Sequence, residues 1–135
     1  SSAASDVYKR QITDYANRLN SSSVTLVEHS DKTSAEDYLK QISRHAGEAQ
    51  ITLLMEAGKE TDSIAFGELY ATWRLSRSDT HLVVGPSDGF GQASDDYPRL
   101  SLSKMTMQHE LAAVVLLDQL YRAAAMHEGK PYHRG

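Results

Sequence analysis

The segment LSLSKMTMQHELAAVVLLDQLYRA, residues 100–123, decides the fold of this chain. It begins with a short apolar run at residues 100–102, which has the length of a buried strand. Small hydroxyl residues follow, and a nearly all-apolar stretch at residues 110–126 predicts a long helix. Thr106 is a candidate cap for this helix, which would place His109 in its first turn. The segment therefore predicts a strand, a loop and a core helix in that order.

The same alternation of strands and helices continues towards the N-terminus. Further apolar runs of strand length lie at residues 24–27, 51–55 and 82–84. Helices are predicted by apolar periodicity and cap residues at residues 11–19, at residues 35–46 after Thr33 or Ser34, and after Asp62 or Ser63. Continuous apolar strands that alternate with helices predict an α/β fold, with a parallel sheet covered by helices on both faces.

Ligands of parallel sheets bind outside the carboxyl ends of the strands, so the informative loops follow Met55, Val84 and Leu102. The loop after Val84 holds Gly85 and Gly89, and glycine permits close backbone approach or a positive φ. Its spacing matches neither the dinucleotide-binding fingerprint nor the phosphate-binding P-loop. An ordinary strand-to-helix turn is the alternative interpretation of this loop.

Composition bounds the class of protein. A chain of 135 residues fits a single domain with one core. The absence of cysteine excludes disulfides, a thiolate nucleophile and sulfur-ligated zinc, and it fits a reducing compartment such as the cytoplasm. The net charge of −4 argues against a general nucleic-acid coat, and cationic residues gather only towards the end of the chain, at Arg122, Lys130 and Arg134.

Neither membrane insertion nor secretion is expected. The longest apolar stretch, residues 111–117, falls far short of the roughly 20 residues that a membrane span needs. The start of the chain lacks the apolar core of a secretory signal. Residues 1–10, SSAASDVYKR, show no apolar periodicity, and we interpret them as a non-native or disordered lead-in to a domain at residues 11–135. A helix that begins at Asp6 is the alternative.

The end of the chain, Pro131-Tyr132-His133-Arg134, combines an aromatic ring, an imidazole and a guanidinium. These groups offer base stacking, proton exchange and phosphate contact in three consecutive residues. A solubilising tail is the alternative. No metal site is predicted, because no two histidines lie three or four residues apart on a helix.

The quoted run and the terminal PYHR strongly resemble the ribosomal RNA large subunit methyltransferase H family, which belongs to the SPOUT class. The upstream pieces ITLLMEAGK, residues 51–59, and LVVGPSDGF, residues 82–90, fall in the matching order and at matching distances. The resemblance covers residue 11 to the end of the chain. A match of this length and order is far more specific than any single motif within it.

The resemblance implies a SPOUT α/β-knot, in which the C-terminal part of the sheet is threaded into a trefoil knot, a rare exception among folds. It also implies S-adenosylmethionine as methyl donor, held mostly by backbone groups of loops 53–56, 85–89 and 102–107. The matching cofactor-binding residues are Leu53, Leu54, Met55, Gly85, Gly89, Leu102, Ser103, Lys104, Met105, Thr106 and Met107.

The activity implied by the resemblance is methylation of N3 of a pseudouridine in large-subunit ribosomal RNA by a homodimer. Tyr132, His133 and Arg134 would complete the catalytic site across the dimer interface, with His133 moving the proton and Arg134 gripping phosphate or the developing uracil anion. Neither a membrane nor DNA is an expected partner. The expected compartment is the cytoplasm, or the matrix or stroma of an organelle in a eukaryote.

Several positions depart from the family pattern. Pro86 stands where a second glycine is usual, Gln108 replaces a proline, and Ala113 replaces an arginine. The first strand and its glycine-containing loop, with which the family begins, have no counterpart in residues 1–10. These departures keep two alternatives open: a SPOUT-like protein that binds RNA or cofactor without turnover, and an α/β domain with a purely structural role.

Overall fold

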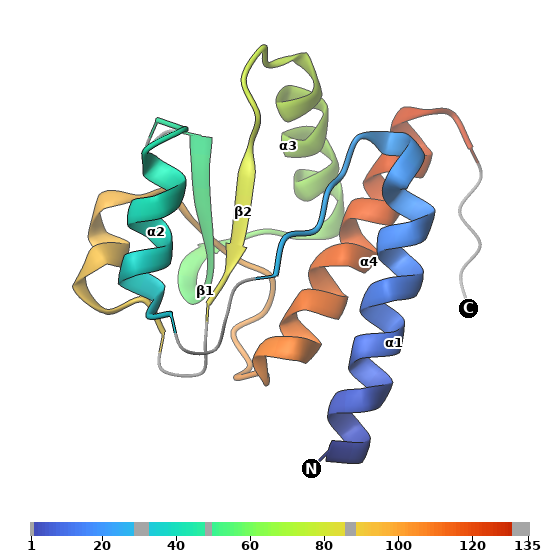
Figure 1. The fold of residues 1–135 in the computed structure, drawn as a ribbon. Helices are drawn as coiled ribbons and strands as arrows, with labels where there is room; N and C mark the ends of the chain where they lie inside the picture. The colour runs from blue at the N-terminus through green and yellow to red at the C-terminus, as the bar shows by residue number, and fades with distance from the viewer. Residues whose placement is uncertain (1, 29–32, 48–49, 86–88, 131–135) are drawn as a thin grey trace. The chain divides into compact units, whose positions relative to one another are not determined.

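The computed structural model describes residues 2–28, 33–47, 50–85 and 89–130. In chain order its elements are α1 (Ser2–Leu19), η1 (Asn20–Ser22), α2 (Ala35–Ser43), β1 (Ile51–Glu60), α3 (Ser63–Leu75), β2 (His81–Val84), η3 (Gly91–Asp96), β3 (Arg99–Ser101) and α4 (His109–His127) (Figure 1). The chain divides into two compact units. We call residues 27–61 and 76–109 the sheet unit, and residues 1–26, 62–75 and 110–135 the helical unit.

The sheet unit is built on three parallel strands in the order β2-β1-β3. Ile51 and Leu53 lie two residues apart on β1 and so point to the same face of the sheet. There they join Val83 of β2 in a buried cluster with Ala35 and Leu39 of α2. The helix α2 therefore covers one face of this sheet.

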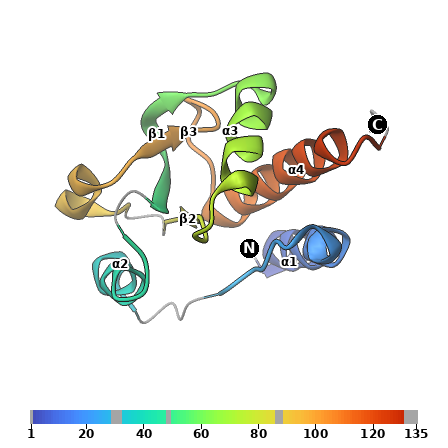
Figure 2. The same ribbon diagram turned by 90° about the horizontal axis from the view of Figure 1, so that it is seen from above.

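Strand β1 approaches β3 twice, with an irregular stretch between the two pairings. Leu100 of β3 lies opposite Leu54 in the first pairing and opposite Lys59 in the second. At Gly58 the two backbones come so close that a Cβ added there would lie 2.6 Å from the carbonyl carbon of Leu100. Figure 2 shows β1 curving beside β3. Glycine at residue 58 permits this crossing because it has no Cβ.

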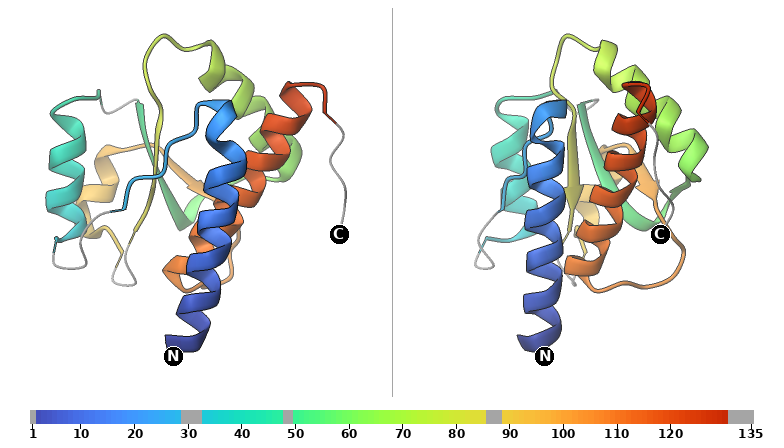
Figure 3. Two further views of the ribbon diagram at one scale, coloured as in Figure 1. Left: turned by 45° about the vertical axis from the view of Figure 1, so that its right-hand side comes forward. Right: turned by 90° about the vertical axis from the view of Figure 1, so that its right-hand side faces the viewer.

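The helical unit contains α1, α3 and α4, which run in the same direction. Tyr15 of α1 contacts Asp118 of α4, and just past the ends of the two helices Ser22 of η1 contacts Glu128. On the other side, Ser63 at the start of α3 contacts Gln119 near the middle of α4, and Tyr70 of α3 packs against His127 at the end of α4 with ring centroids 5.8 Å apart. Figure 3 shows α1 running alongside α4. In both pairs of helices, contact positions advance together towards the C-terminus, which fixes the parallel direction.

Several predictions from the sequence are confirmed. The sheet is parallel, β2 contains residues 82–84, and β3 begins within one residue of the predicted strand. Of the alternative caps, Ser34 accepts a hydrogen bond from the Asp37 amide at 3.1 Å at the start of α2. Asp62 accepts one from the Ala65 amide at 2.8 Å at the start of α3. Each cap is a hydrogen bond between residues three positions apart, so the sequence alone indicates it.

Two predicted boundaries are wrong. Residues 24–27 form no strand, and Leu26 and Val27 are exposed, because a short apolar run needs a paired neighbour to become a strand. Residues 56–59, expected as a loop, continue β1 as far as Glu60. The reason is the second pairing with β3, which adds a hydrogen bond from the Thr61 amide to the Ser101 carbonyl at 3.2 Å.

The start of the chain also differs from the expectation of disorder. Residues 2–10 are helical and continue without a break into residues 11–19 as α1. The helix starts earlier than Asp6, the alternative start considered above. The proposed boundary between residues 10 and 11 stays a prediction.

Candidate cofactor site

The register of the sheet brings the three predicted loops to one edge. Leu54 of β1 lies opposite Val84 of β2 and opposite Leu100 of β3. Because the strands are parallel, the chain runs on from these three residues in the same direction: β2 ends at Val84 and β3 at Ser101, whereas β1 continues through Met55 to Glu60. The segments that follow belong to the sheet unit. Segments from three separate parts of the sequence thus meet where parallel sheets bind ligands.

The residues at the end of the first half of β1 differ in burial. Leu53 is 0% exposed and belongs to the buried cluster beneath α2. Leu54 and Met55 are half-buried, and Met55 packs against the edge of the same cluster. At this edge the side chains of Leu54 and Met55 are therefore partly accessible, whereas the side chain of Leu53 is enclosed and leaves only its backbone groups for a ligand.

Gly85 lies against an aromatic ring. A Cβ added at Gly85 would lie 2.7 Å from two carbons of the Phe90 ring, and Phe90 is 5% exposed. The close approach that the sequence indicated at Gly85 is therefore made, in this structure, by Phe90, which the sequence analysis did not single out. Gly89 has φ of +77°, the left-handed conformation that favours glycine. Pro86, one of the departures noted above, lies outside the described residues.

The loop at residues 102–107 is organised by its own hydroxyl groups. The buried Ser101 hydroxyl donates to the Ser103 carbonyl at 2.9 Å, and the Ser103 hydroxyl accepts from the Met105 amide at 3.0 Å. Leu102, Ser103 and Met107 are half-buried, whereas Lys104, Met105 and Thr106 are exposed. The hydroxyl groups of Ser101, at the end of β3, and of Ser103 thus hold the start of this loop in a turn.

Thr106 does not cap α4, contrary to the expectation from the sequence. The helix begins at His109, and the Thr106 hydroxyl instead donates to a carboxylate oxygen of Glu56 at 3.2 Å. Lys104 forms an ion pair with Glu60 at 3.4 Å. Glu56 is the last residue of the predicted loop 53–56 but was not singled out for its side chain, and Glu60 was not among the predicted site residues. The signal that identifies them is the extended β1, which the apolar pattern of residues 51–55 does not reveal.

The whole chain is similar to known proteins. A family model described as a predicted SPOUT methyltransferase matches residues 1–133. The chain belongs to the SPOUT methyltransferase family. The resemblance and the SPOUT α/β class inferred from it are thereby confirmed, whereas the trefoil knot stays a prediction.

Relatives of this SPOUT family member are named ribosomal RNA large subunit methyltransferase H. The protein of Anaeromyxobacter sp. (strain Fw109-5) is 42% identical over 87 residues, which make up 63% of this chain and 57% of that protein. The protein of Nitrosomonas eutropha is 38% identical over 86 residues, or 62% of this chain and 56% of that protein. The protein of Synechococcus sp. (strain RCC307) is 36% identical over 113 residues, or 81% of this chain and 74% of that protein. The chain therefore spans little more than half the length of the first two relatives.

The residues at the sheet edge fit S-adenosylmethionine, the donor that a SPOUT methyltransferase implies. Half-buried Leu54, Met55 and Met107 offer apolar surface for a flat base. Residues 102–107 lie between β3 and α4, so their backbone groups are not used in a helix or strand. Among the described residues, no group of His, Asp or Glu side chains is arranged to hold a metal ion.

The predicted catalytic residues Tyr132, His133 and Arg134 lie outside the described residues. The structure does describe how α4 ends just before them. The Gly129 amide donates to the Met126 carbonyl at 3.1 Å and the Lys130 amide to the Ala125 carbonyl at 2.7 Å, with Gly129 at φ of +72°. This is a Schellman motif, which stops the helix at a defined residue. The direction in which the chain leaves α4 is therefore set by Gly129.

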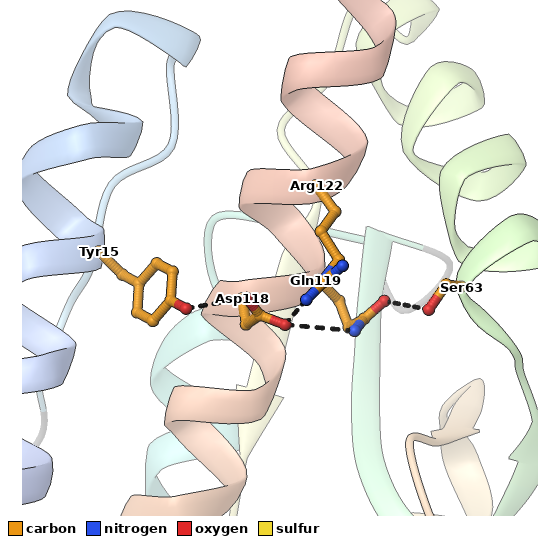
Figure 4. Close-up of polar contacts among 5 residues, drawn as sticks. All are labelled: Tyr15, Ser63, Asp118, Gln119 and Arg122. Carbon is orange, nitrogen blue, oxygen red and sulfur yellow. Dashed lines mark hydrogen bonds and ion pairs between the residues drawn. The ribbon is translucent and has the colours of Figure 1, made fainter. Parts of the chain in front are cut away.

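The polar face of α4 is occupied within the helical unit. Asp118 accepts a hydrogen bond from the Tyr15 hydroxyl at 2.8 Å and pairs with Arg122 at 2.9 Å, and Gln119 accepts one from the Ser63 hydroxyl at 2.7 Å (Figure 4). Gln119 and Arg122 lie three residues apart in the sequence, so they share one face of α4. The structure shows both side chains bonded to residues of their own unit.

None of the helices in the described part of the chain combines the length and the apolar character needed to cross a membrane.

Proposed function

We propose that this chain acts as an S-adenosylmethionine-dependent methyltransferase on large-subunit ribosomal RNA, at N3 of a pseudouridine. The observation that carries the proposal is the register that places Leu54 opposite both Val84 and Leu100 in a member of the SPOUT family. It supports the proposal because the predicted cofactor segments 53–56, 85–89 and 102–107 lie in or directly after parallel strands, at one edge of the sheet. The names of the relatives supply the RNA substrate.

In the proposed reaction, S-adenosylmethionine bound at the sheet edge supplies a methyl group on a positively charged sulfur. The N3–carbon bond forms as the sulfur–carbon bond breaks, and the N3 proton must leave. Loops 53–56, 85–89 and 102–107 align the donor with the acceptor, because methyl transfer depends on orientation more than on a protein nucleophile. We assign His133 to accept the N3 proton, Arg134 to hold phosphate or the uracil anion, and Tyr132 to stack against RNA.

The proposal includes a homodimer, a trefoil knot and the compartment in which ribosomes are methylated, the cytoplasm or an organelle. The catalytic tail of one subunit would complete the cofactor site of its partner. This arrangement gives the acidic chain a local cationic group, Arg134, at the point where RNA must bind. A variant with His133→Ala, mixed with a variant that cannot bind the donor, tests it: restored methylation supports a shared site, and no restoration contradicts it.

Isothermal titration of S-adenosylmethionine into the protein tests the cofactor site. We expect binding by the parent and loss of binding in Gly85→Leu, because Phe90 already occupies the space beside Gly85. Gly67→Ala is the matched control, since a Cβ at Gly67 meets no atom within 4 Å. Circular dichroism confirms that each variant is folded. Absence of binding by the folded parent contradicts the proposed function.

Methyl transfer is tested separately with ribosomal subunits that lack the modification. Transfer of the labelled methyl group to N3 of the pseudouridine, lost in His133→Ala, supports the enzyme. Binding of S-adenosylmethionine without any transfer supports the alternative of a SPOUT-like binding protein, to which Pro86 and Ala113 point.

A further inference from the structure

Two side-chain contacts join the extended part of β1 to the loop at residues 102–107. A carboxylate oxygen of Glu56 accepts a hydrogen bond from the Thr106 hydroxyl at 3.2 Å. The carboxylate of Glu60 lies 3.4 Å from the ammonium nitrogen of Lys104. All four residues belong to the sheet unit, and the contacts reach the middle and the end of the loop.

The backbone of β1 borders the start of the same loop. Leu100 lies opposite both Leu54 and Lys59, and Ser101 lies opposite Glu60. The Thr61 amide donates to the Ser101 carbonyl at 3.2 Å. The loop thus leaves a strand that is held by β1 at two places, and Glu56 comes from the irregular stretch between those places. The side chain of Glu56 therefore contacts the loop at Thr106, beyond the part of the chain that is held by pairing between β1 and β3.

The two contacts differ in geometry. Both partners of the ion pair between Lys104 and Glu60 are largely exposed, with side chains 73% and 67% accessible, so water screens most of their attraction. The contact from Thr106 to Glu56 also lies at the exposed surface, and at 3.2 Å it is longer than a typical O–H···O bond, but as a hydrogen bond it is directional. It is therefore the contact that sets the orientation of the loop at Thr106.

We propose that Glu56 is a positioning residue for the donor: through Thr106 it holds residues 102–107 in the conformation that accepts S-adenosylmethionine. The inference rests on the proposed function, because this loop is the proposed cofactor loop. The physical reason is preorganisation. A loop that is already ordered loses less conformational freedom when a ligand binds, and the saving appears as affinity.

The test is titration of S-adenosylmethionine and of its uncharged product, S-adenosylhomocysteine, into the whole chain and its variants. We expect Glu56→Ala and Thr106→Val each to weaken binding of both ligands about five- to tenfold, as one hydrogen bond is lost. The double variant should be no weaker than either single variant, because both changes remove the same contact. Glu56→Gln should restore affinity to within about twofold, since its amide oxygen accepts the same hydrogen bond. Glu68→Ala, at another exposed glutamate, is the control.

Hydrogen exchange of the ligand-free protein gives a second measurement. Amides of residues 102–107 should exchange faster in Glu56→Ala and Thr106→Val than in the parent, and at the parent rate in Glu56→Gln. Unchanged exchange and unchanged affinity in Glu56→Ala overturn the inference. The inference is also overturned if Glu56→Gln weakens the binding of S-adenosylmethionine but not that of S-adenosylhomocysteine. The carboxylate would then act on the charge of the sulfonium. Failure of the parent to bind either ligand contradicts the proposed function, while the exchange rates still decide whether Glu56 orders the loop.

Discussion

A Cβ added at Gly58 would lie 2.6 Å from the carbonyl carbon of Leu100 and 2.8 Å from its amide nitrogen. The neighbours are backbone atoms of a paired strand, so they have little freedom to move aside. The crossing of β1 over β3 is therefore possible only with glycine at residue 58. The same crossing places Glu56 and Glu60 beside the loop at residues 102–107.

Gly58→Ala should lower the free energy of unfolding by about 1–3 kcal/mol, the usual cost of forcing extra atoms into a packed region. Urea denaturation followed by circular dichroism measures the change. Gly67→Ala is the matched control: its Cβ enters open space within α3, and alanine favours the helix by about 1 kcal/mol. Equal stability of Gly58→Ala and the parent would show that β1 and β3 do not cross at this distance.

Asp62→Ala should lower the free energy of unfolding by about 0.5–2 kcal/mol, because the Ala65 amide at the start of α3 loses its acceptor. Asp62→Asn keeps an oxygen at the same place, so its free energy of unfolding should fall much less. The comparison by thermal unfolding separates the capping hydrogen bond from the negative charge. A loss as large in Asp62→Asn as in Asp62→Ala would contradict the capping role.

Tyr15→Phe should lower the free energy of unfolding by about 1 kcal/mol, because Asp118 loses the hydrogen bond that joins α1 to α4. The ring contact between Tyr15 and Tyr121, with centroids 6.2 Å apart, is kept in this variant. Tyr8→Phe makes the same chemical change two turns earlier in α1 and serves as control. If both variants lose equal stability, the contact with Asp118 does not hold the helices together.

Gly129→Ala should lower the free energy of unfolding by about 1–2 kcal/mol, because alanine is strained at the positive φ that ends α4. Gly129→Asn should cost less, since asparagine tolerates this conformation better. We further expect Gly129→Ala to reduce methyl transfer more than binding of S-adenosylmethionine, because the residues after Gly129 include the proposed catalytic tail. Equal reduction of both would contradict a role for this helix end in directing the tail.

Glu128 should make unfolding sensitive to acid. The hydrogen bond from the Ser22 hydroxyl at 2.9 Å, aided by Lys130, lowers the pKa of Glu128 below its usual value of 4.5. A lowered pKa in the folded state means that the stabilisation is present above pH 4.5 and is lost as the pH falls through the lowered value. The melting temperature of the parent should exceed that of Ser22→Ala at neutral pH, and the difference should shrink below pH 4.5. A difference that is constant with pH would show that the carboxylate of Glu128 is not involved.

The elements that the sequence predicted well are those set by neighbouring residues. The caps Ser34 and Asp62, the strand at His81–Val84 and the long helix His109–His127 follow from apolar periodicity and local hydrogen bonding. The sheet edge at which Leu54 lies opposite Val84 and Leu100 was also predicted, because the carboxyl ends of parallel strands meet at one edge. The cofactor loops proposed at this edge stay a prediction. The sequence by itself thus determined the α/β class, the parallel sheet and the edge that holds the candidate site.

Only the tertiary structure decided what happens where distant segments meet. It extended β1 to Glu60, packed Phe90 against Gly85 and joined Thr106 to Glu56, residues 50 positions apart. It also left residues 24–27 without a strand, although their composition favours one. Apolar pattern and secondary-structure propensity depend on the residues next to each other in the sequence. The pairing and crossing of strands and the conformation of loops depend on residues that the fold brings together from distant positions.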